Sequence, residues 1–384
     1  MKKWVTFAIL ASIYFLVYFH RTSPAVLADI LAAEFSASAL ALGLLSSAYF
    51  YPYAILQIPV GAASDYIGAK KVIFSFTLTA AVGCLLFALA SSFEMATLAR
   101  FLIGVGVAGV YVPTLKVISK IFEPREFATT IGILFAVGNF GAIFSTLPLA
   151  YAVNTIGWRE TFLILAALTL SLVALSTMVA DVRSGERIKL SDLPKVVRER
   201  NLWLLGVSGM LRYGVMMGYQ GLWGGAFLMT VYGMDRELAG SILLSAALGT
   251  LVSSPLMGLL SDRVFGRKET LMFGAIGFLI CWFPLTFATT SLSVAQLFAI
   301  SFALGFFSGA GPVAYALVVE SFPLRMTGLA TSVLNVFPFI GASLFQVLMG
   351  YMLDVGMGYS EVFATCLAAS LVSLLCLLMI REDR

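Results

Sequence analysis

The sequence has few charged residues and little that could serve as enzyme machinery. Charged residues make up 11% of the 384 residues, whereas a soluble domain has about 25%. The one histidine is His20, and we find no metal-ligand cluster, no serine–histidine–aspartate arrangement and no phosphate-binding glycine loop. The cysteines lack metal-type or CxxC spacing and all lie in apolar runs: Cys84, Cys281, Cys366 and Cys376. We therefore expect no enzyme activity, no cofactor and no metal site.

Long apolar runs dominate the chain instead. Hydrophobic residues make up 60% of it, and each run of about 20 to 28 residues is long enough to cross roughly 30 Å of hydrocarbon. We predict an all-α polytopic membrane protein with twelve helices in two pseudo-symmetric six-helix bundles, residues 1–180 and 201–384, joined by a polar linker at 181–200. The expected helices are 4–31, 38–62, 70–92, 95–121, 127–153, 158–180, 201–231, 237–260, 269–289, 292–320, 327–353 and 358–380.

The basic residues are distributed unevenly about the predicted membrane. They gather at the termini, in the linker and at helix ends on the same side, while the opposite side has only Arg159 and Arg236. Because positive charge marks the cytoplasmic side, we expect both termini and the linker in the cytoplasm. The chain should be an integral protein of a bacterial inner (plasma) membrane, and a monomer.

Two stretches repeat each other at matched places. "GAASDYIGAKK" (61–71) follows the second helix, and "GLLSDRVFGRK" (258–268) follows the eighth. The aspartates of both turns can accept from helix N-terminal amides or pair with the basic residues. We expect these turns to act in conformational gating through Asp65, Lys70, Lys71, Asp262, Arg267 and Lys268.

With twelve helices in two halves and this repeated turn, the chain resembles the major facilitator superfamily. The stretch "RFLIGVGVAGVYVPTLKVISKIFEPRE" (100–126) is similar to the fourth helix of that superfamily. The resemblance implies two six-helix bundles around a central substrate cavity, lined mainly by helices 1, 4, 7 and 10, with alternating access by rocking of the bundles.

The first helix carries an arginine within its apolar run. Arg21 lies roughly 25 Å along this helix, and Tyr14 and Tyr18 share its face because of their i, i+4, i+7 spacing. A charge at this depth costs roughly 2.5 to 3.5 kcal/mol, so it should face a cavity or a partner. A guanidinium with two hydroxyls suits a carboxylate or phosphate. The alternative is that Arg21 ties the helix to carbonyls of a neighbouring helix.

Other polar residues extend this set of substrate-binding candidates. Arg212 lies near the middle of the seventh helix, and Lys116 is close enough to the end of the fourth to reach water instead. The remaining candidates are Tyr219, Gln220, Gln57 and Asn139.

Segments on the first and seventh helices are similar to one branch of the superfamily, the organophosphate:phosphate antiporters. They are "YFHR" (18–21) and "LRYG" (211–214). The chain departs from that branch at Gly138 and Gln57, which stand where it has histidine and lysine. The resemblance implies a small organic anion, a carboxylate or phosphate ester, as the substrate.

The coupling partner stays open between a proton and a counter-anion. His20 and Asp29 are the candidates for a proton-coupling group, since histidine titrates near physiological pH. An exchanger would need neither residue. Three other functions remain alternatives: a drug:proton antiporter, a carrier of neutral or zwitterionic nutrients such as amino acids, and a non-transporting sensor.

Overall fold

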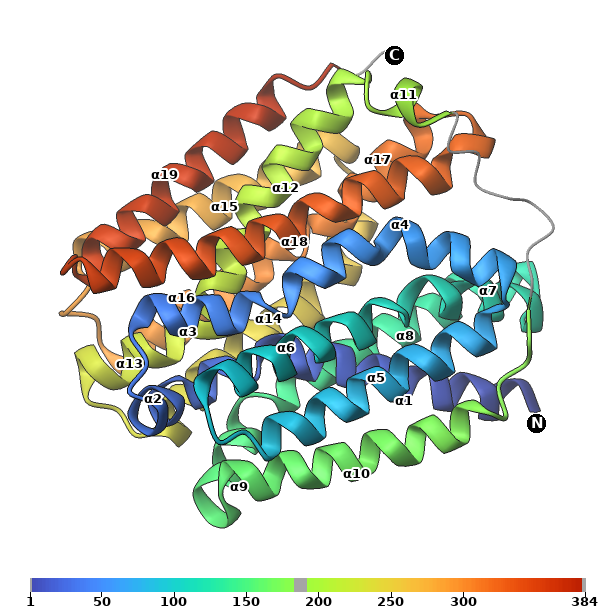
Figure 1. The fold of residues 1–384 in the computed structure, drawn as a ribbon. Helices are drawn as coiled ribbons and strands as arrows, with labels where there is room; N and C mark the ends of the chain where they lie inside the picture. Colours follow the sequence, from blue (N-terminus) through green and yellow to red (C-terminus); the bar gives the residue numbers. More distant parts are fainter. Residues whose placement is uncertain (1, 183–191, 382–384) are drawn as a thin grey trace. The chain divides into compact units, whose positions relative to one another are not determined.

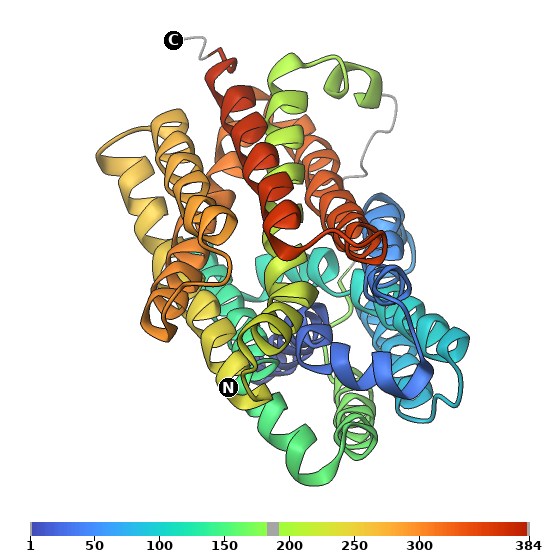
Figure 2. The same ribbon diagram turned by 90° about the vertical axis from the view of Figure 1, so that its left-hand side faces the viewer.

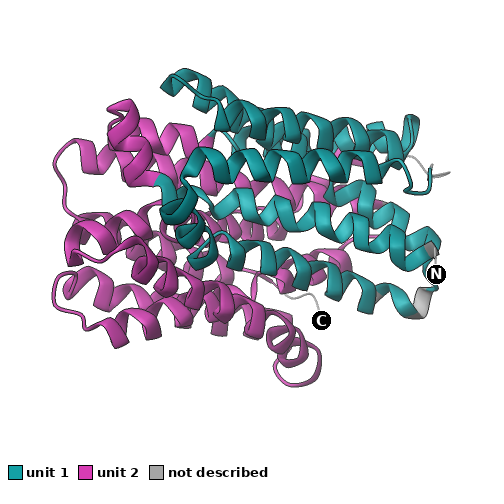
Figure 3. Ribbon diagram, turned by 90° about the horizontal axis from the view of Figure 1, so that it is seen from below, with its two compact units in different colours: residues 1–27, 48–188 teal, residues 28–47, 189–384 magenta. Residues whose placement is uncertain are grey.

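The computed structural model describes residues 2–182 and 192–381, and these form helices and short connections without a strand. The middle part of the predicted linker, 183–191, lies outside the described residues. Two compact units divide the chain (Figure 3). The first unit comprises residues 1–27 and 48–188, and the second comprises 28–47 and 189–384.

The helices of the first unit pack as adjacent rods. In Figure 1, α5 lies between α6 and α10, and α1 runs along α8. The helices are α1 (Lys2–Thr22), α4 (Phe50–Tyr66), α5 (Ala69–Ala88), α6 (Phe93–Ala108), α7 (Tyr111–Ile121), α8 (Pro124–Phe144), α9 (Leu147–Ile156) and α10 (Trp158–Ser176), while α2 (Pro24–Phe35) crosses from the first unit into the second.

The second unit is built around one long helix. Figures 1 and 2 show α18 with α12 and α3 packed along it, and α14 pairs with α16. Its helices are α3 (Ala39–Ser47), α11 (Leu193–Val196), α12 (Arg200–Gly218), the π-helix η2 (Tyr219–Trp223), α13 (Gly224–Tyr232), α14 (Arg236–Arg263), α15 (Arg267–Phe287), α16 (Val294–Ser308), α17 (Gly311–Ser321), α18 (Leu324–Asp354) and α19 (Tyr359–Leu378).

Most of the predicted membrane helices are present as long apolar helices. Within the described residues, ten are long and apolar enough to cross a membrane, and the pair Thr129–Phe144 and Leu147–Ile156, bent by 42°, makes an eleventh. The segment predicted as a single helix over 201–231 is instead divided into α12, η2 and α13. The π-helix interrupts the regular hydrogen-bond ladder there.

Prolines account for the other breaks in the predicted helices. In a helix, a proline has no N–H to donate to the carbonyl of the residue four positions before it, and its ring clashes with that carbonyl. The single helices predicted over 4–31, 38–62, 95–121, 127–153 and 292–320 are each divided in two. Each break precedes or adjoins a proline, namely Pro24, Pro52, Pro113, Pro148 and Pro312.

The short helix α3 and the residues before it, 28–47 in all, are part of the second unit, although residues 1–27 and 48–188 belong to the first. The carboxylate of Asp354 accepts from the backbone N–H groups of Ala39 (2.8 Å) and Leu40 (3.0 Å) at the start of α3. Gly43 lies so close to α18 that an added Cβ would be 2.5 Å from the carbonyl oxygen of Gln346. Residues 28–47 thus belong to the second unit, and the first unit ends at residue 188.

The two repeated turns adopt the same backbone conformation. Gly68 precedes α5 with φ of 94°, and Gly266 precedes α15 with φ of 90°. Residues with a Cβ rarely adopt this conformation. The glycine of each repeat is therefore required by the backbone and starts a membrane-crossing helix at the same place in both units.

Candidate functional site

Aromatic rings surround the predicted anion-binding arginine inside the first unit. The guanidinium carbon of Arg21 lies 4.5 Å from the ring centre of Tyr18 and 5.5 Å from that of Tyr53 on α4, and Tyr53 also hydrogen-bonds Arg21. Arg21 is 6% exposed. A guanidinium held face-on by rings directs its N–H donors outward in its own plane, where a carboxylate can accept two of them.

The rings continue from α1 to the neighbouring helices. Tyr14 lies 5.2 Å from Tyr18 and stacks on Tyr111 of α7 at 5.6 Å. A Cβ added to Gly138 of α8 would be 3.0 Å from the ring of Tyr14 and 3.1 Å from that of Tyr18. Gly138 therefore lets α8 approach the two tyrosines that the sequence analysis placed on one face.

Sequence reasoning did not single out Tyr53 and Tyr111. Tyr53 lies within the second predicted span and Tyr111 within the fourth, and the fourth was among those expected to line the cavity. The position of two tyrosines in these spans was the available signal, but only the fold shows that their rings meet Arg21 and Tyr14.

Two further predicted candidates donate to their own helices. The side chain of Gln57 donates to the carbonyl of Tyr53 at 3.1 Å, and that of Asn139 donates to the carbonyl of Phe135 at 3.0 Å. Gln57 is buried and Asn139 is half-buried.

The side chain of Lys116, on α7, reaches the first repeated turn. Its ammonium group is 2.5 Å from the carboxylate of Asp65, and it donates to the carbonyl of Gly61 at 2.9 Å. The side chain of Asp65 is only 5% exposed. The structure thus joins a substrate candidate, Lys116, to a gating candidate, Asp65.

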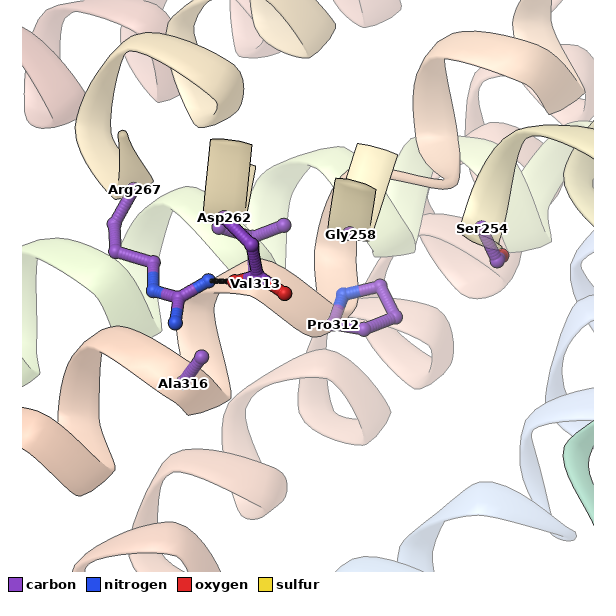
Figure 4. Close-up of a pocket in the computed structure, with 7 residues that line it drawn as sticks. All are labelled: Ser254, Gly258, Asp262, Arg267, Pro312, Val313 and Ala316. Carbon is purple, nitrogen blue, oxygen red and sulfur yellow. Dashed lines mark hydrogen bonds and ion pairs between the residues drawn. The ribbon is translucent and has the colours of Figure 1, made fainter. Parts of the chain in front are cut away.

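The second repeated turn has an ion-pair network of a different kind (Figure 4). Arg267 donates to Asp262 within the turn and to the hydroxyl of Ser261 at 3.0 Å. The same guanidinium donates to Glu320 on α17 at 2.8 Å. The first unit connects its turn to α7 through a turn aspartate, and the second connects its turn to α17 through a turn arginine.

A hollow of about 250 Å³ lies beside this second network. Helices α7 and α17 have the same length, and Ala316 occupies the position in α17 that Lys116 has in α7. The short alanine leaves unfilled the place that a lysine fills in the first unit. The hollow is lined by Ser254, Gly258, Asp262, Arg267, Pro312, Val313 and Ala316.

Arg212 is buried within the second unit and is 6% exposed. Its two terminal nitrogens lie 3.5 Å from a Cβ placed on Gly274 of α15 and 3.9 Å from one placed on Gly311 of α17. Among the described residues it has no hydrogen-bond or ion-pair partner. Both distances are ordinary van der Waals contacts, so the guanidinium lies against α15 and the start of α17.

The two other candidates on this segment lie in the π-helix. Tyr219 is fully buried, its hydroxyl lies 2.8 Å from that of Ser301, and its ring meets the edge of Trp282 at 6.0 Å. Gln220 is also buried. Tyr219 thus joins η2 to α16 and α15.

His20 contacts aromatic rings, and its own carbonyl holds Arg100. The imidazole lies 5.7 Å from Phe19 and 6.1 Å from Phe162, and among the described residues neither ring nitrogen has a hydrogen-bond partner. Arg100 donates to the His20 carbonyl at 2.8 Å. In an unbroken helix this carbonyl would accept from residue 24, but Pro24 has no N–H, and Arg100 and the hydroxyl of Ser23 (3.4 Å) donate to it instead.

The second proton-coupling candidate is part of an ion pair. The carboxylate of Asp29 on α2 lies 2.6 Å from the guanidinium of Arg236 at the start of α14. Both belong to the second unit. Asp29 is 42% exposed at its side chain, so this pair is in contact with solvent.

Comparisons with known proteins agree on one family. The family model described as Major Facilitator Superfamily matches residues 10–224 and 205–384. The chain is 25% identical to the protein named "Probable sulfoacetate transporter SauU" of Cupriavidus necator, over 77% of this chain and 75% of that one. It is 25% identical to "Probable L-galactonate transporter" of Escherichia coli over 88% and 80%, and 28% identical to Monocarboxylate transporter 13 of Rattus norvegicus over 79% and 72%.

A solved structure supports the fold. The chain superposes on a bacterial homologue of the human lysosomal transporter Spinster with a TM-score of 0.74 and 19% identity, over 98% of this chain and 95% of that one. The predicted helical two-half membrane fold is therefore confirmed, with the helix breaks described above as the corrections to it.

Proposed function

Because this chain belongs to the Major Facilitator Superfamily, we propose that it is a secondary carrier that moves a small organic anion across the membrane by alternating access. The protein is a transporter and not an enzyme, as the sequence predicted. The names of its relatives support the substrate class, since sulfoacetate, galactonate and monocarboxylates are organic anions.

The single observation that carries this proposal is the buried state of Arg212. An arginine within the membrane costs roughly 2.5 to 3.5 kcal/mol even on the mildest scales, and here no described residue accepts from it. A bound carboxylate, sulfonate or phosphate would supply acceptors and opposite charge. An anion is therefore the ligand whose binding most lowers the free energy of this site.

Arg21 would serve as the anion-binding residue of the first unit. Its ring contacts fix the orientation of the guanidinium, and Tyr14 and Tyr18 stand on the same face of α1 as potential hydroxyl donors. Of the other candidates, Gln57 and Asn139 would shape the binding surface of the first unit, and Tyr219 and Gln220 that of the second. Lys116 would act with the gating turns formed around Asp65, Lys70 and Lys71, and around Asp262, Arg267 and Lys268.

For coupling we favour exchange of anions over proton symport. When the carrier returns without a ligand, the buried charge of Arg212 would be uncompensated, and a second anion bound for the return step would compensate it. A proton on His20 would instead add positive charge beside Arg100, whose guanidinium bonds the backbone of that same residue. We propose a monomer in a bacterial inner membrane with both termini in the cytoplasm.

The test is uptake of radiolabelled organic acids, beginning with sulfoacetate and galactonate, into proteoliposomes. Arg212→Gln should lower the initial rate at least tenfold, because the neutral amide cannot offset an anion. Arg263→Gln is the matched control, since Arg263 is an exposed arginine of the same unit, and it should transport like the wild type.

Two results would count against the proposal. Transport at the wild-type rate by Arg212→Gln would remove its main support. Uptake of neutral sugars or amino acids in preference to every organic acid tried would assign the chain to another substrate class.

A further inference from the structure

A second hollow, of about 420 Å³, lies on the first unit between the start of α5 and the end of α10. Two lysines of the first repeated turn are among its walls, and the others are mostly apolar or carry hydroxyls. The hollow is lined by Ile67, Lys70, Lys71, Phe74, Ser75 and Thr177.

The two lysines form no polar interaction with the described part of the chain. Among the described residues, neither Lys70 nor Lys71 has a hydrogen bond or ion pair. The basic residues of the second turn behave differently, since Arg267 belongs to the ion-pair network and Lys268 donates to the carbonyl of Ile380 at 2.7 Å. Of the two basic residues that end each repeated turn, those of the first copy have no hydrogen-bond or ion-pair partner among the described residues, whereas those of the second copy do.

The second repeat also has a larger side chain where the first has its hollow. When α5 and α15 are aligned on their N-cap glycines, Gly68 and Gly266, Ser75 of the first repeat corresponds to Phe273 of the second. The ring of Phe273 lies 6.3 Å from that of Phe265. Serine in place of this phenylalanine leaves the space beside the lysines open.

The lysine at the third position of α5 does not serve the helix itself. The corresponding residue of α15 is Glu269, an acidic residue in the first turn, which the helix dipole favours. The first turn of α5 has no acidic residue and carries Lys71 instead. The carboxylate of Asp181 lies beside Gly68 and supplies negative charge at this helix N-terminus, but among the described residues Lys71 forms no ion pair with it.

The hollow lies at the level where helices leave the membrane. The apolar span Ala69–Ala88 begins beside Lys70, and the span Trp158–Ser176 ends directly before Thr177. The neighbouring apolar side chains are exposed, with Ile67 at 47% and Met178 at 63%. Positive charge therefore lies next to a surface suited to acyl chains, at headgroup depth.

We propose that this hollow, with Lys70 and Lys71, binds the phosphodiester headgroup of an anionic glycerophospholipid. The lysine ammonium groups offset the phosphate charge, the hydroxyl of Ser75 donates to one of its oxygens, and the acyl chains lie along Ile67 and Met178. The positive-inside pattern predicts this end to be cytoplasmic, where anionic lipids give the leaflet its negative surface potential. This site is separate from Arg21 and Arg212 and does not depend on the transported substrate.

The experiment is native mass spectrometry of the delipidated full-length protein with equal amounts of phosphatidylglycerol and phosphatidylcholine. The wild type should retain phosphatidylglycerol in preference. Each of Lys70→Gln and Lys71→Gln should lower that retention about fivefold, as expected for one basic residue at a membrane surface. Lys120→Gln is the matched control, because Lys120 is an exposed lysine near the corresponding end of α7, and it should retain the lipid like the wild type.

Three results would overturn the proposal. The first is equal retention of the two lipids by the wild type. The second is an unchanged phosphatidylglycerol signal in the Lys70→Gln/Lys71→Gln double variant, whose folding is checked by its melting temperature. The third is complete displacement of the lipid by inorganic phosphate, which would assign the hollow to a soluble anion instead.

Discussion

Arg100 illustrates how one side chain can repair a break that another residue causes. Its bond to the His20 carbonyl replaces the N–H that Pro24 lacks. A hydrogen bond from a charged donor contributes about 1.5–3 kcal/mol, and the Ser23 hydroxyl at 3.4 Å is a weaker donor to the same carbonyl, so Arg100→Met should lower the melting temperature of the purified protein. In a Pro24→Ala background the helix can supply its own donor, and the same substitution should cost less.

A double-mutant cycle on melting temperature checks this explanation. Equal losses from Arg100→Met with and without Pro24 would mean that Arg100 stabilises the unit by packing, for example on the ring of Tyr49 at 5.2 Å, and not through the His20 carbonyl.

The pair Asp65–Lys116 gives a second prediction at this scale. Because Asp65 is nearly buried, Lys116→Met should leave a carboxylate without its partner, and Asp65→Asn should leave the partly buried ammonium group of Lys116 without its counter-charge. Each single variant should be less stable and slower in transport than the double variant, since removing both charges leaves neither uncompensated. Measured rates that fall further in the double variant than in either single one would contradict this.

At the level of residues, spacing could identify only contacts along one helix. Tyr14, Tyr18 and Arg21 follow from positions four and seven apart, and the structure places them together. The ring of Tyr53 comes from a different helix, and no pattern in the sequence fixes how α4 is rotated. For the same reason Lys116 could be placed near a helix end, but its partner Asp65 could not be identified.

At the scale of elements, glycine marks where helices meet. Gly43→Ala should destabilise the second unit, because the new methyl group would lie 2.5 Å from the Gln346 carbonyl. The same change at Gly132 in α8 meets nothing within 4 Å and should be neutral or stabilising by up to about 1 kcal/mol, since alanine favours helix. Thermal unfolding of both variants compares them directly, and equal melting temperatures would rule out close packing of α3 on α18 as a source of stability.

The existence of the helices could be predicted, but their interruptions could not all be predicted. Apolar runs show where a chain can cross a membrane, and they gave the spans that the structure largely contains. Prolines within those runs kink a helix in one context and end it in another, as Pro59, Pro255, Pro284 and Pro338 within continuous helices demonstrate. The surrounding packing decides between these outcomes, and the π-helix η2 left no sequence signal that we recognised.

At the scale of the whole molecule, the choice between exchange and symport can be measured. We expect uptake into proteoliposomes to require an organic anion inside, and a pH gradient alone to drive little accumulation. His20→Ala and Asp29→Asn should then still exchange. Accumulation driven by a pH gradient without internal anion, and lost in either variant, would establish proton coupling through that residue instead.

The two repeated turns differ in how much water reaches their ion pairs, and this gives the two halves unequal sensitivity to ionic strength. The Asp65 side chain is 5% exposed, whereas Asp262 and Glu320 are 56% and 53% exposed. Dissolved ions screen the interactions of exposed charges over a length of about 8 Å at physiological salt, which shortens as salt is added, and they screen buried charges much less. Added salt should therefore weaken the ion pairs of Arg267 and leave the Asp65–Lys116 ion pair intact. A molecule built by duplication would then respond to its ionic surroundings through one half alone.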